Sequence, residues 1–593
     1  MTSTINPDRP VPINEKAGPE HTYHAESSHV EHIPGDKDDN APFVWNYDVV
    51  TNLLALYLTY FSSTWALTIP STSIAFIMYE FPGDYSTVGW IAGVPGLILC
   101  VVQIFLGDVS DLFGRRRFVL AGTILGTAGM IIGGRGTSIS MIVAGQVLNG
   151  LALTLGYLST PLMAEAVPKR WRGPVIGVGT GLGGIAAIAG GLSQGAYMKY
   201  HVGGTYKGWR VGFYLGSVFF FLSFVTLVLF YHPSPRPIPE GMSTQRRLLK
   251  IDWSGIFLGT SGLLFLLLRL QYGGSSPWDS PRVLAFLAVG GVVTLIFIAW
   301  EWKGVGPEDG LFPASLFVHR NYAVTLALSF MEGMVMFSSQ AFLPQMILAL
   351  LTTDFVMSAV YNLPSIGGAL LGALSTSIIL AKTKEAKWIT MFGMAMLAAG
   401  GGLLAVIQPG ITLAACFFPS ILLGFGMGSL GTAIPVIATL CTPNQFVATS
   451  VAVGSSVRGL GGAIGTVVFT TIYSSKLTEF LPAKVGLAVI QAGLPPASVG
   501  PLLQAAATRN PELIASVPGV TPQVMAALQS STAQAYADAF RFIWYALIPF
   551  SVITLVICAF LHTTKEQMTL QVAAAVQHRH KDHHTESKLE EGD

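Results

Sequence analysis

Long apolar stretches alternate with short polar loops along most of the chain. Each stretch has roughly the 20 residues that an α-helix needs to cross a bilayer. The pattern therefore predicts an all-α integral membrane protein of fourteen spans. The expected spans lie near residues 49–71, 87–106, 118–136, 141–161, 174–197, 210–231, 254–271, 282–300, 322–343, 355–380, 388–407, 411–437, 447–473 and 541–561.

Three segments depart from this pattern. Residues 1–46 and 563–593 are polar and contain several histidines, and such a composition cannot bury enough apolar surface to fold alone. We expect both to be disordered tails. Residues 474–540 are rich in Ala, Gly, Pro and Gln. We expect short helical runs there, and no independent core, because the segment is short and weakly patterned.

Composition and charge narrow the class further. The chain is 51% hydrophobic and only 11% charged, against about 25% charged in an average soluble domain. The net charge of +1 does not suggest a nucleic-acid partner. Lysine and arginine are concentrated in alternate short loops, which places both termini in the cytoplasm and residues 474–540 outside. The cysteines lack metal-ligand spacing, so we expect no metal and no cofactor.

Two charged residues lie near mid-depth in predicted spans, Glu332 in the ninth and Arg458 in the thirteenth. Such a charge costs several kcal/mol unless it is paired or faces water, so it is a candidate for function. We hypothesise that the two residues face the central cavity and interact, directly or through water. A purely structural ion pair is the alternative. Several polar and aromatic residues could line a substrate or proton pathway, although each alone more often serves packing or interfacial anchoring. They are Trp65, Gln146, Gln340, Tyr361 and Asn362. We find no phosphate-binding loop and no nucleophile motif, which argues against a primary pump and against an enzyme.

The loop after the second span carries the most specific motif. It reads Gly107-Asp-Val-Ser-Asp111-Leu-Phe-Gly114-Arg115-Arg116-Arg117. Glycines permit a tight turn between two helices, and the arginines could simply mark a cytoplasmic loop. The whole string resembles the signature loop of the major facilitator superfamily. The resemblance implies a conformational latch between two halves of the protein, formed by Gly107, Asp111, Gly114, Arg115 and Arg116.

Fourteen spans and several further strings resemble the fungal trichothecene efflux pump family. The strings include Glu165-Ala-Val-Pro168-Lys-Arg-Trp-Arg172, Gly208-Trp209-Arg210 and Arg458-Gly-Leu-Gly461-Gly462-Ala-Ile-Gly465. The resemblance implies the major facilitator fold. Six-helix halves would span residues 47–231 and 322–562, and residues 232–321 would carry linkers and two inserted helices.

The same resemblance implies a function. We expect a monomeric secondary transporter in the cell membrane that exports a small organic molecule by alternating access, with membrane lipid and protons as its other partners. The first span has Ser62-Ser63-Thr64-Trp65 where proton-coupled drug exporters often carry an acid. We therefore hypothesise that Glu332 carries the proton instead. An iron-siderophore importer of the same fold and a nutrient sensor without transport activity remain as alternatives.

Overall fold

The computed structural model describes residues 45–565 apart from 82–87, 205–206, 234–250, 272–279, 305–318, 353, 443–445, 508–513 and 515. A few side chains within these ranges, including that of Asp111, also lie outside the described part. The predicted tails fall almost entirely outside it. The helices of the first part of the chain are α1 (Tyr47–Glu80), α2 (Trp90–Phe113), α3 (Arg115–Gly134), α4 (Ile139–Gly156), α5 (Ser159–Glu165), α6 (Arg172–Lys199) and α7 (Trp209–Phe230). The others are α9 (Trp253–Gln271), α10 (Pro281–Lys303), α11 (Arg320–Leu350), α12 (Phe355–Thr383), α13 (Ala386–Leu404), α14 (Leu413–Leu440), α15 (Val447–Gln491), α16 (Val499–Ala507) and α18 (Pro522–Ala559).

The predicted all-α membrane fold is confirmed. Among the described residues, 12 helices are long and apolar enough to cross a membrane. Helices α1 and α9 occupy the other two predicted positions but are not among the 12. Helix α1 is long enough at 34 residues, but it is rich in serine and threonine. Helix α9 has 19 residues, of which only Trp253–Leu268 are counted, because the side chains after Leu268 lie outside the described part. The count of fourteen spans therefore stays a prediction.

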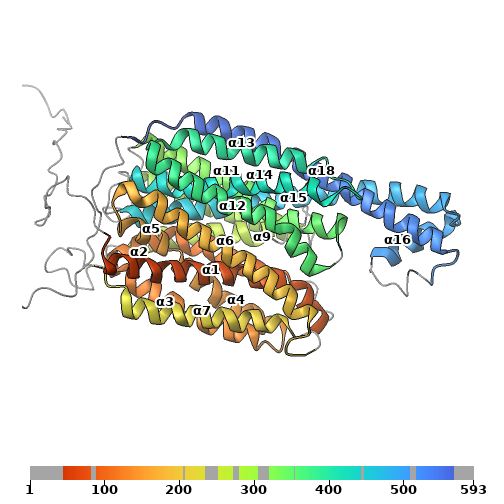
Figure 1. The fold of residues 1–593 in the computed structure, drawn as a ribbon, viewed down its shortest axis with the longest axis horizontal. Coiled ribbons are helices and arrows are strands. Elements are labelled where there is room, and N and C mark those ends of the chain that lie inside the picture. Colours follow the sequence, from red (N-terminus) through yellow and green to blue (C-terminus); the bar gives the residue numbers. More distant parts are fainter. Residues whose placement is uncertain are drawn as a thin grey trace, which may run out of the picture. The chain divides into compact units, whose positions relative to one another are not determined.

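The helices pack as two groups (Figure 1). In the first, α3 packs on α4 and α7, and α1 packs on α6 and α7. In the second, α12 and α13 pack on α14, and α11 packs on α15. Helix α18 packs on α13 and α15. The groups meet along two pairs of helices, α6 with α12 and α2 with α15. Small residues allow this approach, since a Cβ atom on Gly177 of α6 would collide with the Ser377 side chain of α12.

The bundle has two ends. At one end the chain turns from α2 into α3 at Gly114, whose φ of 89° favours glycine. We call this the loop end; the last residues of α18 also lie there, on the left in Figure 1. The opposite end, where α16 lies on the right in Figure 1, is the far end.

At the far end, residues 474–540 differ from the prediction of short helical runs without a core. Helix α15 continues to Gln491 as one helix of 45 residues, about 68 Å long at 1.5 Å per residue. Helix α18 starts at Pro522 and runs back into the bundle. The extensions of α15 and α18 enclose, with α16, a small apolar core of Val485, Val489, Leu494, Leu502, Val517, Val524 and Leu528. Two long helices supply most of the buried face that a separate short segment would lack.

The inserted pair lies against both groups of helices. Helix α9 packs on α2 and α15, one from each group, while α10 packs on α9. Apolar residues of α2, α9 and α15 form one cluster at this junction, including Ile104, Leu263 and Leu460. The pair therefore borders the line along which the two groups meet.

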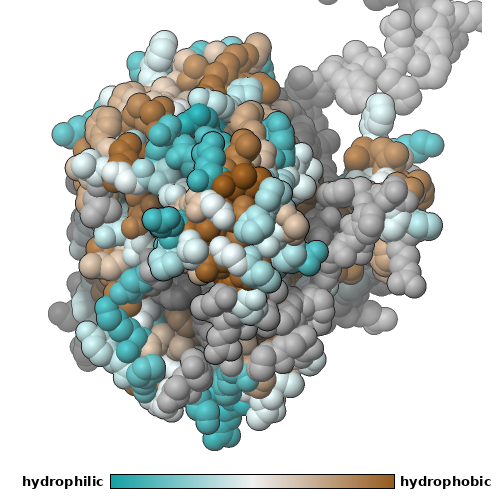
Figure 2. Space-filling model, turned by 90° about the vertical axis from the view of Figure 1, so that its right-hand side faces the viewer, coloured by the Kyte–Doolittle hydropathy of each residue, from teal (hydrophilic) through white to brown (hydrophobic). Residues whose placement is uncertain are grey.

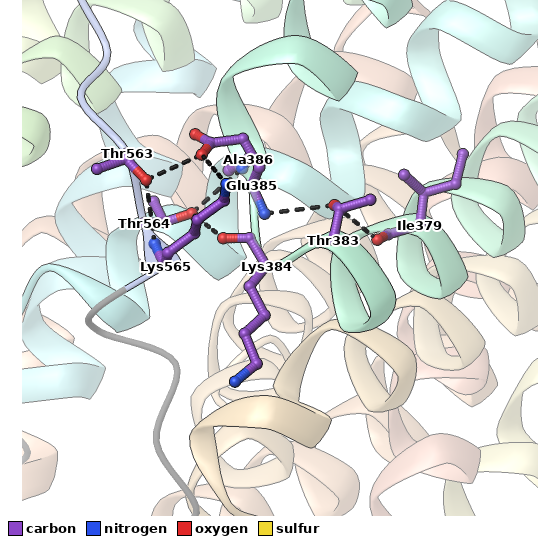
Figure 3. A network of polar contacts seen from close by, with 8 residues as sticks. All are labelled: Ile379, Thr383, Lys384, Glu385, Ala386, Thr563, Thr564 and Lys565. Atoms are coloured by element: carbon purple, nitrogen blue, oxygen red, sulfur yellow. Dashed lines mark hydrogen bonds and ion pairs between the residues drawn. The ribbon is translucent and has the colours of Figure 1, made fainter.

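At the loop end, the chain after α18 is held by a network of polar contacts (Figure 3). Thr563 Oγ1 donates to Glu385 Oε2 at 2.9 Å, and Thr564 Oγ1 donates to the Lys384 carbonyl at 3.0 Å. The Ala386 N–H donates to Thr564 Oγ1 at 3.2 Å. Residues 563–565, assigned to the tail by sequence, are thus tied to the turn between α12 and α13.

Candidate functional site

Glu332 and Arg458 form an ion pair between α11 and α15. Arg458 Nε lies 2.6 Å from Glu332 Oε2, and Arg458 Nη2 donates to Glu332 Oε1 at 2.7 Å. Nη2 also lies 2.8 Å from Sδ of Met336. The Glu332 side chain is only 1% exposed, whereas that of Arg458 is 25% exposed. The carboxylate is thus sealed behind a guanidinium that is partly accessible.

Two tyrosines from the first group of helices face this pair. Tyr60 of α1 and Tyr157 at the end of α4 have ring centroids 5.4 Å apart. Both interact electrostatically with Arg458. Thr64 of α1, one turn beyond Tyr60, donates its hydroxyl to the Tyr60 carbonyl at 3.0 Å. The pair predicted from the second group of helices therefore lies beside aromatic residues of the first.

Helices α6 and α14 complete the surroundings. A Cβ atom on Gly431 of α14 would lie 3.6 Å from Arg458 Nη2 and 3.9 Å from Thr180 Cγ2 of α6. Helices of both groups thus surround the guanidinium, so its exposed part faces the inside of the bundle. We call the following residues the central cluster: Tyr60, Thr64, Tyr157, Thr180, Glu332, Met336 and Arg458.

Side-chain exposure rises from the central cluster toward the far end on two helices, α11 and α1. On α11, residues four apart share one face; on that face Glu332 is buried, Met336 half-buried and Gln340 exposed. On α1, exposure rises in the same direction from half-buried Tyr60 to exposed Thr72. Figure 2 looks onto this end, where hydrophilic and hydrophobic side chains lie side by side. A polar, partly exposed face on each helix is what a path for a solute requires.

The loop end is closed by contacts between the two groups of helices. Arg172, at the start of α6, is fully buried. Its Nη1 donates to the Thr439 carbonyl of α14 at 2.7 Å, and its Nε donates to the Ala164 carbonyl at 3.0 Å. Nearby, Gly107 of α2 lies against the backbone of Thr449 on α15, where a Cβ atom would find no space.

The residues of the predicted latch differ in the contacts they make. Gly107 contacts the second group of helices, and Gly114 forms the turn. Arg115 instead forms a buried ion pair with Glu165, and Arg116 Nη2 donates to the Val228 carbonyl at 3.2 Å. These partners, Glu165 and Val228, belong to the first group of helices. The side chain of Asp111 lies outside the described part.

Two predicted pathway residues lie inside the first group of helices, away from the central cluster. Trp65 is 2% exposed, and its Nε1 donates to the Gly212 carbonyl of α7 at 3.0 Å. Gln146 is fully buried and accepts a hydrogen bond from Asn149 at 3.3 Å. Both side chains are hydrogen-bonded within the first group of helices.

The other three predicted pathway residues lie in the second group. Gln340 shares the face of α11 that carries Glu332 and Met336, two turns closer to the far end. Tyr361 and Asn362 are half-buried on α12, and the Tyr361 ring lies 6.5 Å from that of Phe417 on α14. Among the predicted pathway residues, the structure brings Glu332 and Arg458 into direct contact.

Sequence reasoning selected neither Tyr60 nor Arg172. Tyr60 lies on the hydroxyl-bearing face of α1 that continues through Thr64 and Thr68, a spacing of four that could have indicated it. Arg172 was read as one of several basic loop residues, since burial cannot be seen in a charged string. In the described part of the chain, no group of three His, Cys, Asp or Glu side chains could hold a metal ion.

Comparisons with known proteins bear on this arrangement. The model of the family described as "Fungal trichothecene efflux pump" matches residues 47–592. The efflux pump dotC of Dothistroma septosporum is 27% identical over 72% of this chain and 72% of its own. The trichothecene efflux pump TRI12 of Fusarium sporotrichioides is 23% identical over 76% of each chain.

A solved structure shows the fold. The major facilitator superfamily proton:xylose symporter XylE matches 88% of this chain and 98% of its own, with a TM-score of 0.54 and 15% sequence identity. Family and fold are those of transporters and not of enzymes. With the names of its relatives, they confirm the predicted class of secondary transporter for small organic molecules. This chain, with the major facilitator fold, belongs to the fungal trichothecene efflux pump family.

Proposed function

We propose that the protein exports its substrate by alternating access in exchange for protons, and that Glu332 carries the proton. The observation that supports this most directly is the place of the Glu332–Arg458 pair. It lies between the two groups of helices, beside Tyr60 and Tyr157, and the Arg458 side chain is 25% exposed there.

In this proposal the loop end is cytoplasmic and the far end faces outward across the cell membrane. The structure then corresponds to the outward-facing state, because its loop end is closed. To face inward, the first group of helices (residues 47–231) would rock against the second (residues 322–562). That motion breaks the Arg172–Thr439 hydrogen bond and separates Gly107 from Thr449.

Glu332 suits the role of proton carrier on chemical grounds. It supplies the one carboxylate of the central cluster. Its proton would neutralise the negative partner of Arg458, weaken the ion pair and free the guanidinium to change its contacts. Proton binding and substrate binding would thus act on the same side chain, Arg458, which is the requirement for coupling two solutes at one site.

The test is transport by purified protein in liposomes with an imposed pH gradient. The probes are labelled neutral metabolites, beginning with a trichothecene, the class that the family description names. In Glu332→Gln, we expect exchange of substrate to continue and accumulation driven by the pH gradient to disappear. The matched control is Glu80→Gln, which removes the carboxylate from a second arginine pair, with Arg210 at 2.7 Å; we expect it to keep gradient-driven accumulation.

Three outcomes would contradict the proposal. If well-folded Glu332→Gln still accumulates substrate with the gradient, protons enter elsewhere. If both Glu332→Gln and Glu332→Ala are recovered only as misfolded protein, the pair is structural, because removal of the carboxylate leaves the charge of Arg458 buried without its partner. If the wild-type protein binds probes without flux, it is a sensor and not a transporter.

A further inference from the structure

The central cluster has a charge balance that bears on what it can bind. One edge of the Arg458 guanidinium, Nε and Nη2, is occupied by Glu332. Within the described part of the chain, Nη1 makes no hydrogen bond, although the side chain is 25% exposed. The site therefore offers one hydrogen-bond donor nitrogen whose positive charge is already balanced by a carboxylate.

This arrangement disfavours an organic anion. A carboxylate is bound most strongly when it meets two guanidinium nitrogens side by side. Glu332 occupies the edge formed by Nε and Nη2, and Met336 Sδ also contacts Nη2, which obstructs the edge formed by Nη1 and Nη2. An anion at Nη1 would also lie close to the Glu332 carboxylate, and like charges brought together without water repel strongly. A neutral carbonyl oxygen accepts from a single N–H without either difficulty.

The other accessible surface of the cluster is aromatic. Tyr60 and Tyr157 are both half-buried, and their rings lie 5.4 Å apart at 47° to one another. Such rings stack on, or meet edge to face, a further flat ring. Thr180 adds a hydroxyl that already donates to the Ile176 carbonyl at 3.0 Å, so its oxygen is left to accept.

We infer that the central cluster binds a neutral, flat aromatic molecule that bears a carbonyl oxygen, with its ring against Tyr60 and Tyr157 and its carbonyl on Arg458 Nη1. The inference rests on the proposed function, in which this cluster is the substrate site. It deepens that function by naming the substrate class.

Three small probes separate the two parts of the inference. Coumarin is a neutral aromatic lactone, octahydrocoumarin keeps the lactone without the aromatic ring, and coumarin-3-carboxylate adds a negative charge. Binding is measured by calorimetry on the full chain in lipid nanodiscs, with empty nanodiscs subtracted. We expect coumarin to bind about 2- to 12-fold more tightly than octahydrocoumarin, from one aromatic contact. We expect coumarin-3-carboxylate to bind at least ~10-fold more weakly than coumarin.

Variants assign these preferences to residues. Tyr60→Leu should bring the ratio of coumarin to octahydrocoumarin affinity close to one. The control Tyr545→Leu alters a 49% exposed tyrosine of α18 and should leave the ratio unchanged. Arg458→Lys keeps a positive partner for Glu332 but removes Nη1, the nitrogen that would donate to the carbonyl. The affinities for coumarin and octahydrocoumarin should therefore fall by similar factors.

The inference is overturned if coumarin-3-carboxylate is the tightest ligand, if no probe binds at millimolar concentration, or if a folded Tyr60→Leu protein keeps the wild-type ratio. The ratio of coumarin to octahydrocoumarin affinity and the preference against the carboxylate are measured first on the wild-type protein. These two results test the inference even if a variant misfolds. If the probes bind in the expected order but the protein transports nothing, the proposed function alone is refuted. If the protein transports but binds coumarin-3-carboxylate more tightly than coumarin, the substrate class alone is refuted.

Discussion

Arg172 offers the sharpest test of how the loop end closes. Its hydrogen bond to the Thr439 carbonyl joins α6 to α14, so it exists only when the two groups of helices meet there. A hydrogen bond from a charged donor is worth about 1.5–3 kcal/mol. At 1.4 kcal/mol per factor of ten, Arg172→Met should shift the balance between closed and open loop ends by roughly 10- to 150-fold.

The shift can be measured as a distance. Spin labels on exposed Arg117→Cys of α3 and Lys382→Cys of α12 report the separation of the two groups at the loop end. The four native cysteines are buried and should not react. We expect one short distance in the parent protein and a second, longer population in the Arg172→Met background.

A matched change isolates the contact between the groups. Arg116→Met also removes a hydrogen bond from an arginine to a carbonyl, but its partner, Val228, lies in the same group of helices. Arg116→Met should keep the parent distance. An unchanged distribution in folded Arg172→Met, or an equal shift in Arg116→Met, would falsify the assignment of Arg172 as the contact that holds the loop end closed.

Three further predictions concern other contacts. The Val356 N–H and Lys199 hold the pKa of the Asp354 carboxyl below its ordinary value of 3.8. The Lys199–Asp354 ion pair should therefore persist above pH 4 and be lost only as pH falls through that lowered pKa. Spin labels on α6 and α12 report the distance between the two helices during acidification; an increase in that distance already near neutral pH would contradict this. Gly107→Val should abolish transport, because its side chain cannot fit against α15; wild-type flux would show that this contact is dispensable. Deletion of 566–593 should leave the melting temperature unchanged while deletion of 562–593 lowers it, since only the latter removes the contacts of Figure 3; equal melting temperatures would contradict a stabilising role.

Some features of this protein followed from the sequence because lipid leaves few alternatives. Backbone polar groups in a bilayer must be satisfied within the chain, so long apolar runs become helices. The same solvent made Glu332 and Arg458 conspicuous, since charges at mid-depth must be paired or hydrated. The two residues are 126 positions apart, and their pairing is the part of the candidate site that the sequence predicted best.

Other features depended on how each helix is rotated and what it packs against. Trp65 and Tyr60 lie on the same predicted span, yet only Tyr60 faces Arg458, whereas Trp65 bonds to α7. The apolar pattern is weak on a helix surrounded by other helices or by lipid, so it does not fix that rotation.

The far-end core and the loop-end contact required the tertiary structure for a different reason. Val485 of α15 is buried because α16 and α18 return beside it, and no local pattern records that return. The apparently ordinary loop arginine Arg172 is fully buried because α14 presents a carbonyl to it. Local sequence therefore determined which segments are helices and which charges need partners. Contacts between distant segments decided which side chains form the site, because burial and pairing depend on neighbours far away in the chain.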